Sequence, residues 1–212
     1  SVAATTRSTT LGRRCVRQES EWNHTMSHAR GPRSTAVAAS TRLSPRQLTS
    51  CIANASSAAE LLRLHSEHGA AFNEIHLATC WSRLGRIRGA ERASLLRNDG
   101  EQLHLLREQT LAALSSWTGN ARALANIAHA LGKLQPRGAE SAKLWTSLES
   151  AVVEEVRGFN PQDLANTAWA FATAGHAAPA LFDAIAAAAV RRLGDFTAQN
   201  LANTVWAFAT RS

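Results

Sequence analysis

The chain contains 212 residues with a formal net charge of +7, and 45% of them are apolar, with 12 Gly, 5 Pro and no Tyr. Because Ala and Leu are abundant while β-branched and aromatic residues are few, this composition favours helix over sheet. Three scattered cysteines argue against a disulfide scaffold, and the lack of any run of 18 apolar residues argues against a membrane span.

The positive charge is concentrated near the N-terminus. Residues 1–46 hold eight of the 23 basic and two of the 16 acidic residues, so the other 166 residues carry fifteen basic against fourteen acidic side chains, a net charge of +1. Residues 1–40 are rich in Ser, Thr, Ala and Arg, which is typical both of a disordered tail and of an organellar transit segment. The transit interpretation predicts a mitochondrial or chloroplast protein, and without it we expect a cytoplasmic one.

Helical patterns follow one another from Leu43 onward, with Gly, Pro or Asn at nearly every junction. Ser44 and Pro45 suit the N-cap and first-turn positions of the first helix, and Asn73 suits the N-cap of the third. No alternating strand pattern is found. We therefore expect an all-α protein with helices at 45–55, 58–68, 73–87, 90–117 with an interruption at 98–100, 120–134, 139–156, 161–174, 178–193 and 197–210.

One ten-residue segment occurs twice, as LANTAWAFAT at 164–173 and LANTVWAFAT at 201–210, with nine of ten residues identical at an offset of 37. A weaker copy, LANIAHAL at 124–131, lies 40 residues before the first. The helices that follow agree as well, since LW at 144–145 matches LF at 181–182. The chain is therefore built, at least in its second half, from a repeated helix pair.

A period of 37–40 residues with two helices per unit predicts an α–α superhelix, a right-handed α-solenoid in which neighbouring units share one core. We expect a helical-repeat domain over 43–212, with the clearest units at 120–158, 159–195 and 196–212, the last of them truncated. Trp81-x-x-x-Gly85 can be set on Phe171-x-x-x-Gly175 as a trace of an earlier copy.

The repeated helix has an apolar face and a narrow polar stripe. At about 100° per residue, Leu164, Ala168 and Phe171 cluster on one side, and Trp169 lies at the edge of this cluster. We expect Trp169 and Trp206 to belong to the core, with stacking on nucleic-acid bases as the alternative. The polar stripe comprises nine residues on three helices: Arg122, Asn126, Lys133, Gln162, Asn166, Thr173, Gln199, Asn203 and Thr210.

This stripe has two interpretations. Amide side chains suit the base edges of single-stranded RNA, and the basic side chains at 122 and 133 could contact phosphate. A repeated Asn can instead hydrogen-bond the backbone of the next unit, and we favour that structural role for Asn126, Asn166 and Asn203, because a residue identical in every copy cannot discriminate bases. The positions that vary between copies are better candidates for reading sequence, and a solvated surface is their alternative.

The LANTxWAFAT helix followed by an LFxAI helix, repeated near 38 residues, resembles the octotricopeptide repeat proteins of algal and protist organelles, relatives of FAST-kinase-like proteins that often carry a RAP domain. The segment 73–85 also resembles the opening of that helical region. The resemblance implies an α-solenoid that binds organellar RNA and acts in its processing, stability or translation. Two departures are that His129 replaces the Trp of the repeat and that no RAP domain follows within the 212 residues.

No phosphate-binding loop, nucleophile elbow or paired catalytic carboxylates with an adjacent base are found in the sequence. We therefore expect no enzyme, no catalytic residues, no metal site and no cofactor. The leading hypothesis is a helical-repeat protein that binds single-stranded RNA and does not enter membranes. Its alternatives are a protein–protein interaction scaffold of the same architecture and the non-catalytic part of a larger RAP-domain factor.

Overall fold

The computed structural model describes residues 43–97, 101–136 and 138–211. The chain divides into two compact units, Ser1–Cys51 and Ile52–Ser212, which we treat separately. Helix α2 (Pro45–Asn54) begins in the first unit, where the Ser44 side chain caps it by accepting a hydrogen bond from the Gln47 backbone at 3.4 Å. The expected tail or transit segment at 1–40 lies outside the described residues. No helix in the described ranges is long and apolar enough to span a bilayer.

The second unit is built from helices throughout its described part, as the composition predicts, and contains no strand there. Most of the predicted helices agree with the observed ones within three residues at each end, and the expected helix at 90–117 is two helices on either side of 98–100. The elements are α3 (Ala58–His68), the 3-10 turn η2 (Gly69–Ala71), α4 (Glu74–Leu84), α5 (Gly89–Arg97), α6 (Glu101–Leu114), α7 (Ala121–Leu134), α8 (Ala139–Glu155), η3 (Val156–Gly158), α9 (Pro161–Ala174), α10 (Pro179–Val190), η4 (Leu193–Asp195) and α11 (Ala198–Thr210).

Local capping explains why the helix boundaries could be predicted. Asn160 accepts a hydrogen bond from the Asp163 backbone at 2.9 Å, and the Asp163 carboxylate accepts one from the Asn160 backbone in return. Asn73 caps α4 in the same reciprocal way with His76. Gly175 ends α9 in the left-handed conformation, at φ 64°, which glycine adopts without steric cost. These interactions involve only residues close in sequence.

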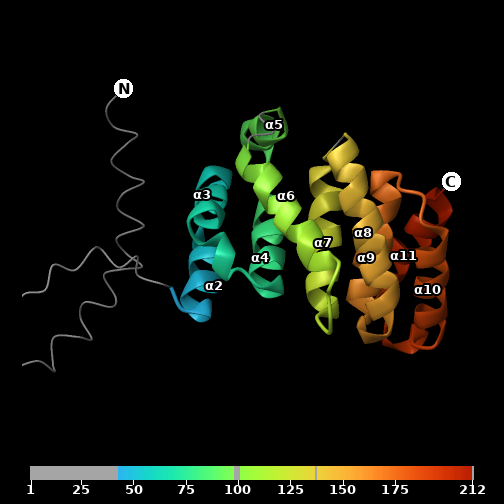
Figure 1. The fold of residues 1–212 in the computed structure, drawn as a ribbon. Coiled ribbons are helices and arrows are strands. Elements are labelled where there is room, and N and C mark those ends of the chain that lie inside the picture. The colour runs from blue at the N-terminus through green and yellow to red at the C-terminus, as the bar shows by residue number, and fades with distance from the viewer. Residues whose placement is uncertain (1–42, 98–100, 137, 212) are drawn as a thin grey trace, which may run out of the picture. The chain divides into compact units, whose positions relative to one another are not determined.

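The helices of the second unit form two layers (Figure 1). In the first layer, α4 packs on α7, α7 on α9, and α9 on α11; in the second, α6 packs against both α3 and α8, and α8 against α10. The core lies between the layers, where Trp145 of α8 meets Phe171 of α9 edge to face at 4.8 Å between ring centroids. Equivalent helices of successive units therefore lie side by side.

Close contacts fix the register within the first layer. A Cβ added to Gly85 would lie 2.9 Å from the Cα of Ala130, and one added to Gly132 would lie 2.8 Å from the Cα of Ala170. Gly85 and Gly132 thus hold equivalent places on α4 and α7, and each lets the next helix approach its backbone. The residues LATCWSRLG at 77–85 consequently align with LANIAHALG at 124–132, an offset of 47.

This register corrects the alignment of Trp81 and Gly85 with Phe171 and Gly175. Gly85 has φ −64° and contacts the next helix, whereas Gly175 has φ 64° and would bring an added Cβ near no other atom. Trp81 is fully buried, and its indole nitrogen donates to the Thr110 hydroxyl of α6 at 2.9 Å. Gly85 therefore allows close helix packing, whereas Gly175 ends a helix, although the residues before them look alike in sequence.

Candidate nucleic-acid interface

One side of the first layer is open to solvent and presents four positions from each helix. On α9 these positions are Gln162, Asn166, Trp169 and Thr173, spaced i, i+4, i+7 and i+11, and at least part of each side chain is exposed while most intervening residues are buried. The register set by the glycine contacts gives the matching positions on the other helices. We call this surface the open face; the remaining members are Ile75, Thr79 and Ser82 of α4 with Arg86 just after it, Arg122, Asn126, His129 and Lys133 of α7, and Gln199, Asn203, Trp206 and Thr210 of α11.

All nine residues of the sequence-predicted stripe belong to the open face. Five of them are exposed: Arg122, Asn126, Gln162, Gln199 and Thr210. Four are partly exposed: Lys133, Asn166, Thr173 and Asn203. The stripe extends further than the sequence indicated, because α4 adds a fourth helix to it.

The favoured structural role of the repeated Asn residues is not observed. Asn203 accepts a hydrogen bond from Gln199 of its own helix at 2.9 Å. Among the described residues, the side chains of Asn126 and Asn166 make no hydrogen bond to the backbone of a neighbouring unit or to any other group. Their amide groups are therefore available to a ligand, and an amide can both donate and accept.

The two tryptophans of the repeat lie on the open face and not, as we expected, in the core. Trp169 is partly exposed, and 45% of Trp206 is accessible. The ring of His129 meets that of Trp169 edge to face, with centroids 5.4 Å apart. Sequence reasoning missed His129 because it judged each helix by hydrophobicity. The spacing of seven residues from Gln162 to Trp169 and from Arg122 to His129 is the signal that could have revealed this row.

Basic side chains gather where α4 and α7 end. Burial lowers the pKa of the Lys133 ammonium below its ordinary value, and the nearby guanidinium groups of Arg88 and Arg86 lower it further. Burial, with a smaller contribution from Lys133, lowers the pKa of His129 to about 4, so this imidazole is neutral at pH 7. Within the described ranges none of Arg86, Arg88 and Lys133 has an acidic partner. An anion bound here would relieve the repulsion between these cations.

Thr173 differs from the other members of the open face. Its hydroxyl oxygen is buried and has no hydrogen-bond partner in the described part of the chain. The residue lines a pocket of about 380 Å³, shared with Trp145, Ser141 and His176, beside the loop that joins α7 to α8. Thr173 therefore lies at the margin of the open face, while its counterpart Thr210 is exposed and donates to the Trp206 carbonyl at 2.8 Å.

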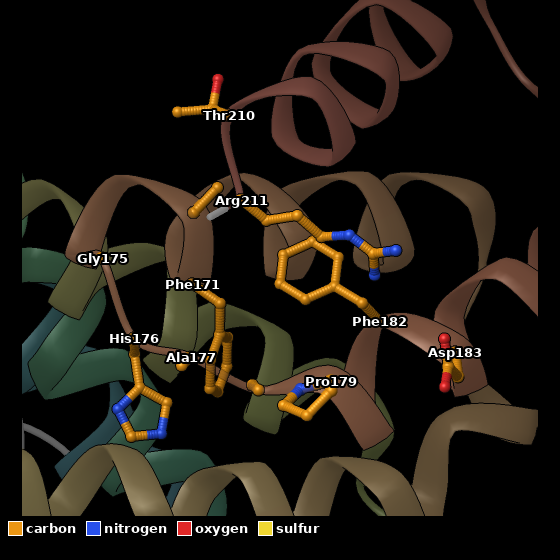
Figure 2. A pocket seen from close by; sticks show the side chains of 11 residues that line it. Phe171, Gly175, His176, Ala177, Pro179, Phe182, Asp183, Thr210 and Arg211 are labelled. Carbon is orange, nitrogen blue, oxygen red and sulfur yellow. The ribbon is translucent and has the colours of Figure 1, made fainter.

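A second pocket, of about 410 Å³, lies between the loop after α9 and the end of α11 (Figure 2). The guanidinium of Arg211 lies over the rings of Phe182 and Phe208, at 5.1 and 4.8 Å from their centroids. His176, also in the lining, is within 3.2 Å of the Glu149 carboxylate. The residues that line this pocket bring together no nucleophile and base, so the pocket does not suggest catalysis.

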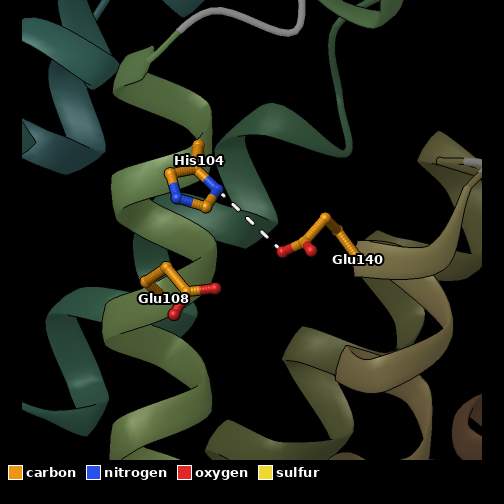
Figure 3. A group of neighbouring side chains, drawn as sticks. All are labelled: His104, Glu108 and Glu140. Carbon is orange, nitrogen blue, oxygen red and sulfur yellow. Dashed lines mark ion pairs between the residues drawn. The ribbon is translucent and has the colours of Figure 1, made fainter.

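Three side chains could offer donor atoms to a cation. The nearest ligand atoms of His104 and Glu108 on α6 and of Glu140 on α8 lie within 4.8 Å of one another (Figure 3). His104 and Glu108 are exposed, and Glu140 is already 3.4 Å from the ammonium of Lys143 and 4.0 Å from His104. This arrangement is equally typical of a charged helix surface, where such pairs contribute little stability.

Comparisons of the chain with protein-family models, with curated proteins and with solved structures found no match.

Proposed function

We propose that the protein is a non-enzymatic helical-repeat protein that binds single-stranded RNA across the open face. In this proposal the two helical layers form a right-handed α-solenoid, which repetition of one packing contact between successive units would generate. The observation that carries the proposal is the open face itself: α7, α9 and α11 present matched rows of amide and ring side chains, Arg86, Arg122 and Lys133 add basic ones, and no acidic residue is among the sixteen positions.

Different residues of the open face would contact different parts of the RNA. Arg86, Arg122 and Lys133 offer cations to phosphates, which positions a strand without reading it. Asn126, Asn166 and Asn203 offer amides to base edges. The rings at 129, 169 and 206 offer surfaces on which unpaired bases stack. Single-stranded nucleic acid exposes base edges and base faces together, and a folded duplex does not, so the combination favours a single strand.

The charge distribution supports this use despite the net charge of +1 outside residues 1–46. The acidic residues are elsewhere on the helices, for example Glu140 and Glu149 on α8 of the second layer. Asp163 is buried beneath the open face, where burial raises its pKa and the neighbouring Arg122 opposes that change. A neutral average therefore coexists with a locally basic surface at α4 and α7, where phosphate would be held.

The two lysines of the chain provide a matched test. Lys133 lies on the open face, and Lys143 lies on α8, so Lys133→Glu and Lys143→Glu change the net charge equally on different layers. We expect a dye-labelled single-stranded RNA of random sequence to bind the unaltered chain with an affinity that falls as salt rises. Lys133→Glu should weaken binding and reduce the slope of log affinity against log salt by about 0.7, whereas Lys143→Glu should change neither.

The interaction scaffold is the alternative function, and exposed apolar side chains on α10 and α11 favour it. Val190 and Val205 are 69% and 67% accessible, and clustered exposed apolar side chains mark interaction surfaces. If RNA binding is absent at low salt, or if both lysine variants bind equally, the RNA proposal is wrong and the scaffold is favoured. The resemblance to octotricopeptide repeat proteins suggests mitochondrial or chloroplast transcripts as the first RNA pools to compare with the random sequence.

A further inference from the structure

Exposed apolar side chains are concentrated in the last described helices. Seven large hydrophobic residues are exposed in the described part of the chain, and five of them belong to α10, α11 and the turn between them. Their accessible fractions are 69% for Val190, 50% for Leu193, 38% for Leu201, 67% for Val205 and 45% for Trp206. Single exposed apolar side chains are ordinary on protein surfaces, but a cluster of this kind marks an interface.

Three of these five positions are buried in the preceding repeat unit, 37 residues earlier. Leu164 is 0% accessible where Leu201 is 38%, and Val156 is 7% accessible where Leu193 is 50%. Ala168, the counterpart of Val205, is fully buried. The elements that pack on this part of the preceding repeat unit are α11, which packs on α9, and α10, which packs on the turn that begins at Val156. The exposed cluster is therefore the continuation of an interface already present in the molecule.

We propose that the outer surface of α10 and α11 binds another helix pair of this repeat. One helix would lie on Ala202, Val205, Trp206 and Ala209 as α11 lies on α9, and the other would cover Leu193 as α10 covers Val156. The partner helix needs a small residue at the place that Ala130 and Ala170 hold, because the preceding helix approaches their backbone closely. Ala207, at the same place on α11, is fully buried. This proposal rests on the packing alone and does not require RNA binding.

A second copy of the chain stacked head to tail would place its α4, the first described helix of the first layer, on α11. Helix α4 lacks the small residue that this contact needs, which argues against such a copy. In the register of the glycine contacts, Arg83 of α4 holds the place of Ala130. The Arg83 guanidinium donates a hydrogen bond to the Ala55 carbonyl of the same chain. An arginine at the point of closest approach would have to be buried without that bond, at a cost that a small residue avoids.

The test extends the full chain after Thr210 with a second copy of residues 174–210, which supplies both helices in register. Val205→Cys in the original α11 reports on the surface, because the native cysteines of the described ranges, Cys51 and Cys80, are buried. We expect alkylation of the introduced thiol, measured by mass spectrometry of its peptide, to be at least about ten-fold slower in the extended chain. A control copy with Arg in place of the residue that matches Ala207 should restore fast alkylation.

Three other results would overturn the proposal that a helix pair binds this surface. Equal alkylation rates in the extended and original chains would overturn the proposal, and so would an added copy that contributes no helical signal in circular dichroism, since its folding depends on this surface. Sedimentation of the original chain tests the other occupant. A concentration-dependent dimer that Val205→Lys disperses would mean that a second copy covers the face, and the proposal would then be wrong.

Discussion

The imidazole of His129 and the indole of Trp169 meet edge to face on neighbouring helices, with ring centroids 5.4 Å apart. They hold the same place in successive repeat units. On the open face they lie between the row of Asn126, Asn166 and Asn203 and the row of Lys133, Thr173 and Thr210. The contact joins α7 to α9 at the surface, while Gly132 and Ala170 join them below it. His129 occupies the position that Trp holds in the other two copies. It is accommodated there because an imidazole can pack against an indole edge.

Replacing Trp169 by Ala should separate ligand binding from stability. A base that stacks on the ring would lose about 1–3 kcal/mol, so we expect single-stranded RNA affinity to fall by about 5- to 150-fold. Phe171→Ala is the comparison, because Phe171 is fully buried and its removal should cost about 3–5 kcal/mol of unfolding free energy. Fluorescence anisotropy and urea unfolding measure the two effects. Unchanged RNA affinity in Trp169→Ala would contradict the stacking role.

Gly132→Ala should destabilise the protein although Ala normally favours helices. An exposed helical Gly gains about 1 kcal/mol on this change, but here the new Cβ would lie 2.8 Å from the Cα of Ala170. We expect a loss of about 1–3 kcal/mol from the forced separation of α7 and α9. Gly194→Ala is the control, since no atom lies near its added Cβ, and its unfolding midpoint should change little. Equal midpoints for both variants would refute the close approach.

The hydrogen bond between Trp81 and Thr110 should couple the two layers energetically. Both residues are buried, and the indole nitrogen donates to the hydroxyl oxygen at 2.9 Å. A double-mutant cycle with Trp81→Phe and Thr110→Val should give a coupling of about 1 kcal/mol in the free energy of unfolding. Additive single effects would indicate that the bond contributes nothing in solution.

Stability should fall as the medium is acidified from about pH 6.5 to pH 4. The pKa of His129 is lowered to about 4 by burial, and burial also lowers the pKa of His65 against the opposing effect of its hydrogen bond to Gln109. Below its ordinary pKa near 6.5 the unfolded chain gains protons that the folded chain does not, so unfolding becomes more favourable until the folded imidazole is protonated too. The loss is absent above that range.

The variant that tests this pH dependence is His129→Gln, which keeps a polar side chain without titrating in this range. Its free energy of unfolding, measured by urea denaturation at steps between pH 4 and pH 7.5, should decrease less with acidification than that of the unaltered chain. A parallel decrease in both proteins would assign the pH dependence to other groups.

Most of the helix boundaries were predictable because the signals that set them are local. Asn73, Asn160 and Gly175 each act within a few residues of their own position. The repeat was also visible, because equal sequences at an offset of 37 residues must present equal faces. By contrast, the earlier copy was set in the wrong register, since Gly85 and Gly175 look alike in sequence and only the contact with Ala130 distinguishes them.

Helix periodicity and capping depend on near neighbours, so they could be read from the sequence: the chain is helical, most helix ends are predictable, and each helix has identifiable polar residues. Which of those residues share a surface depends on how the helices pack. Trp169 was assigned to the core by its hydrophobicity, yet helix packing leaves it partly exposed, with its ring against that of His129 on α7. That difference arises because burial depends on which helix lies next to a residue, and the neighbouring helix comes from a unit about 40 residues away.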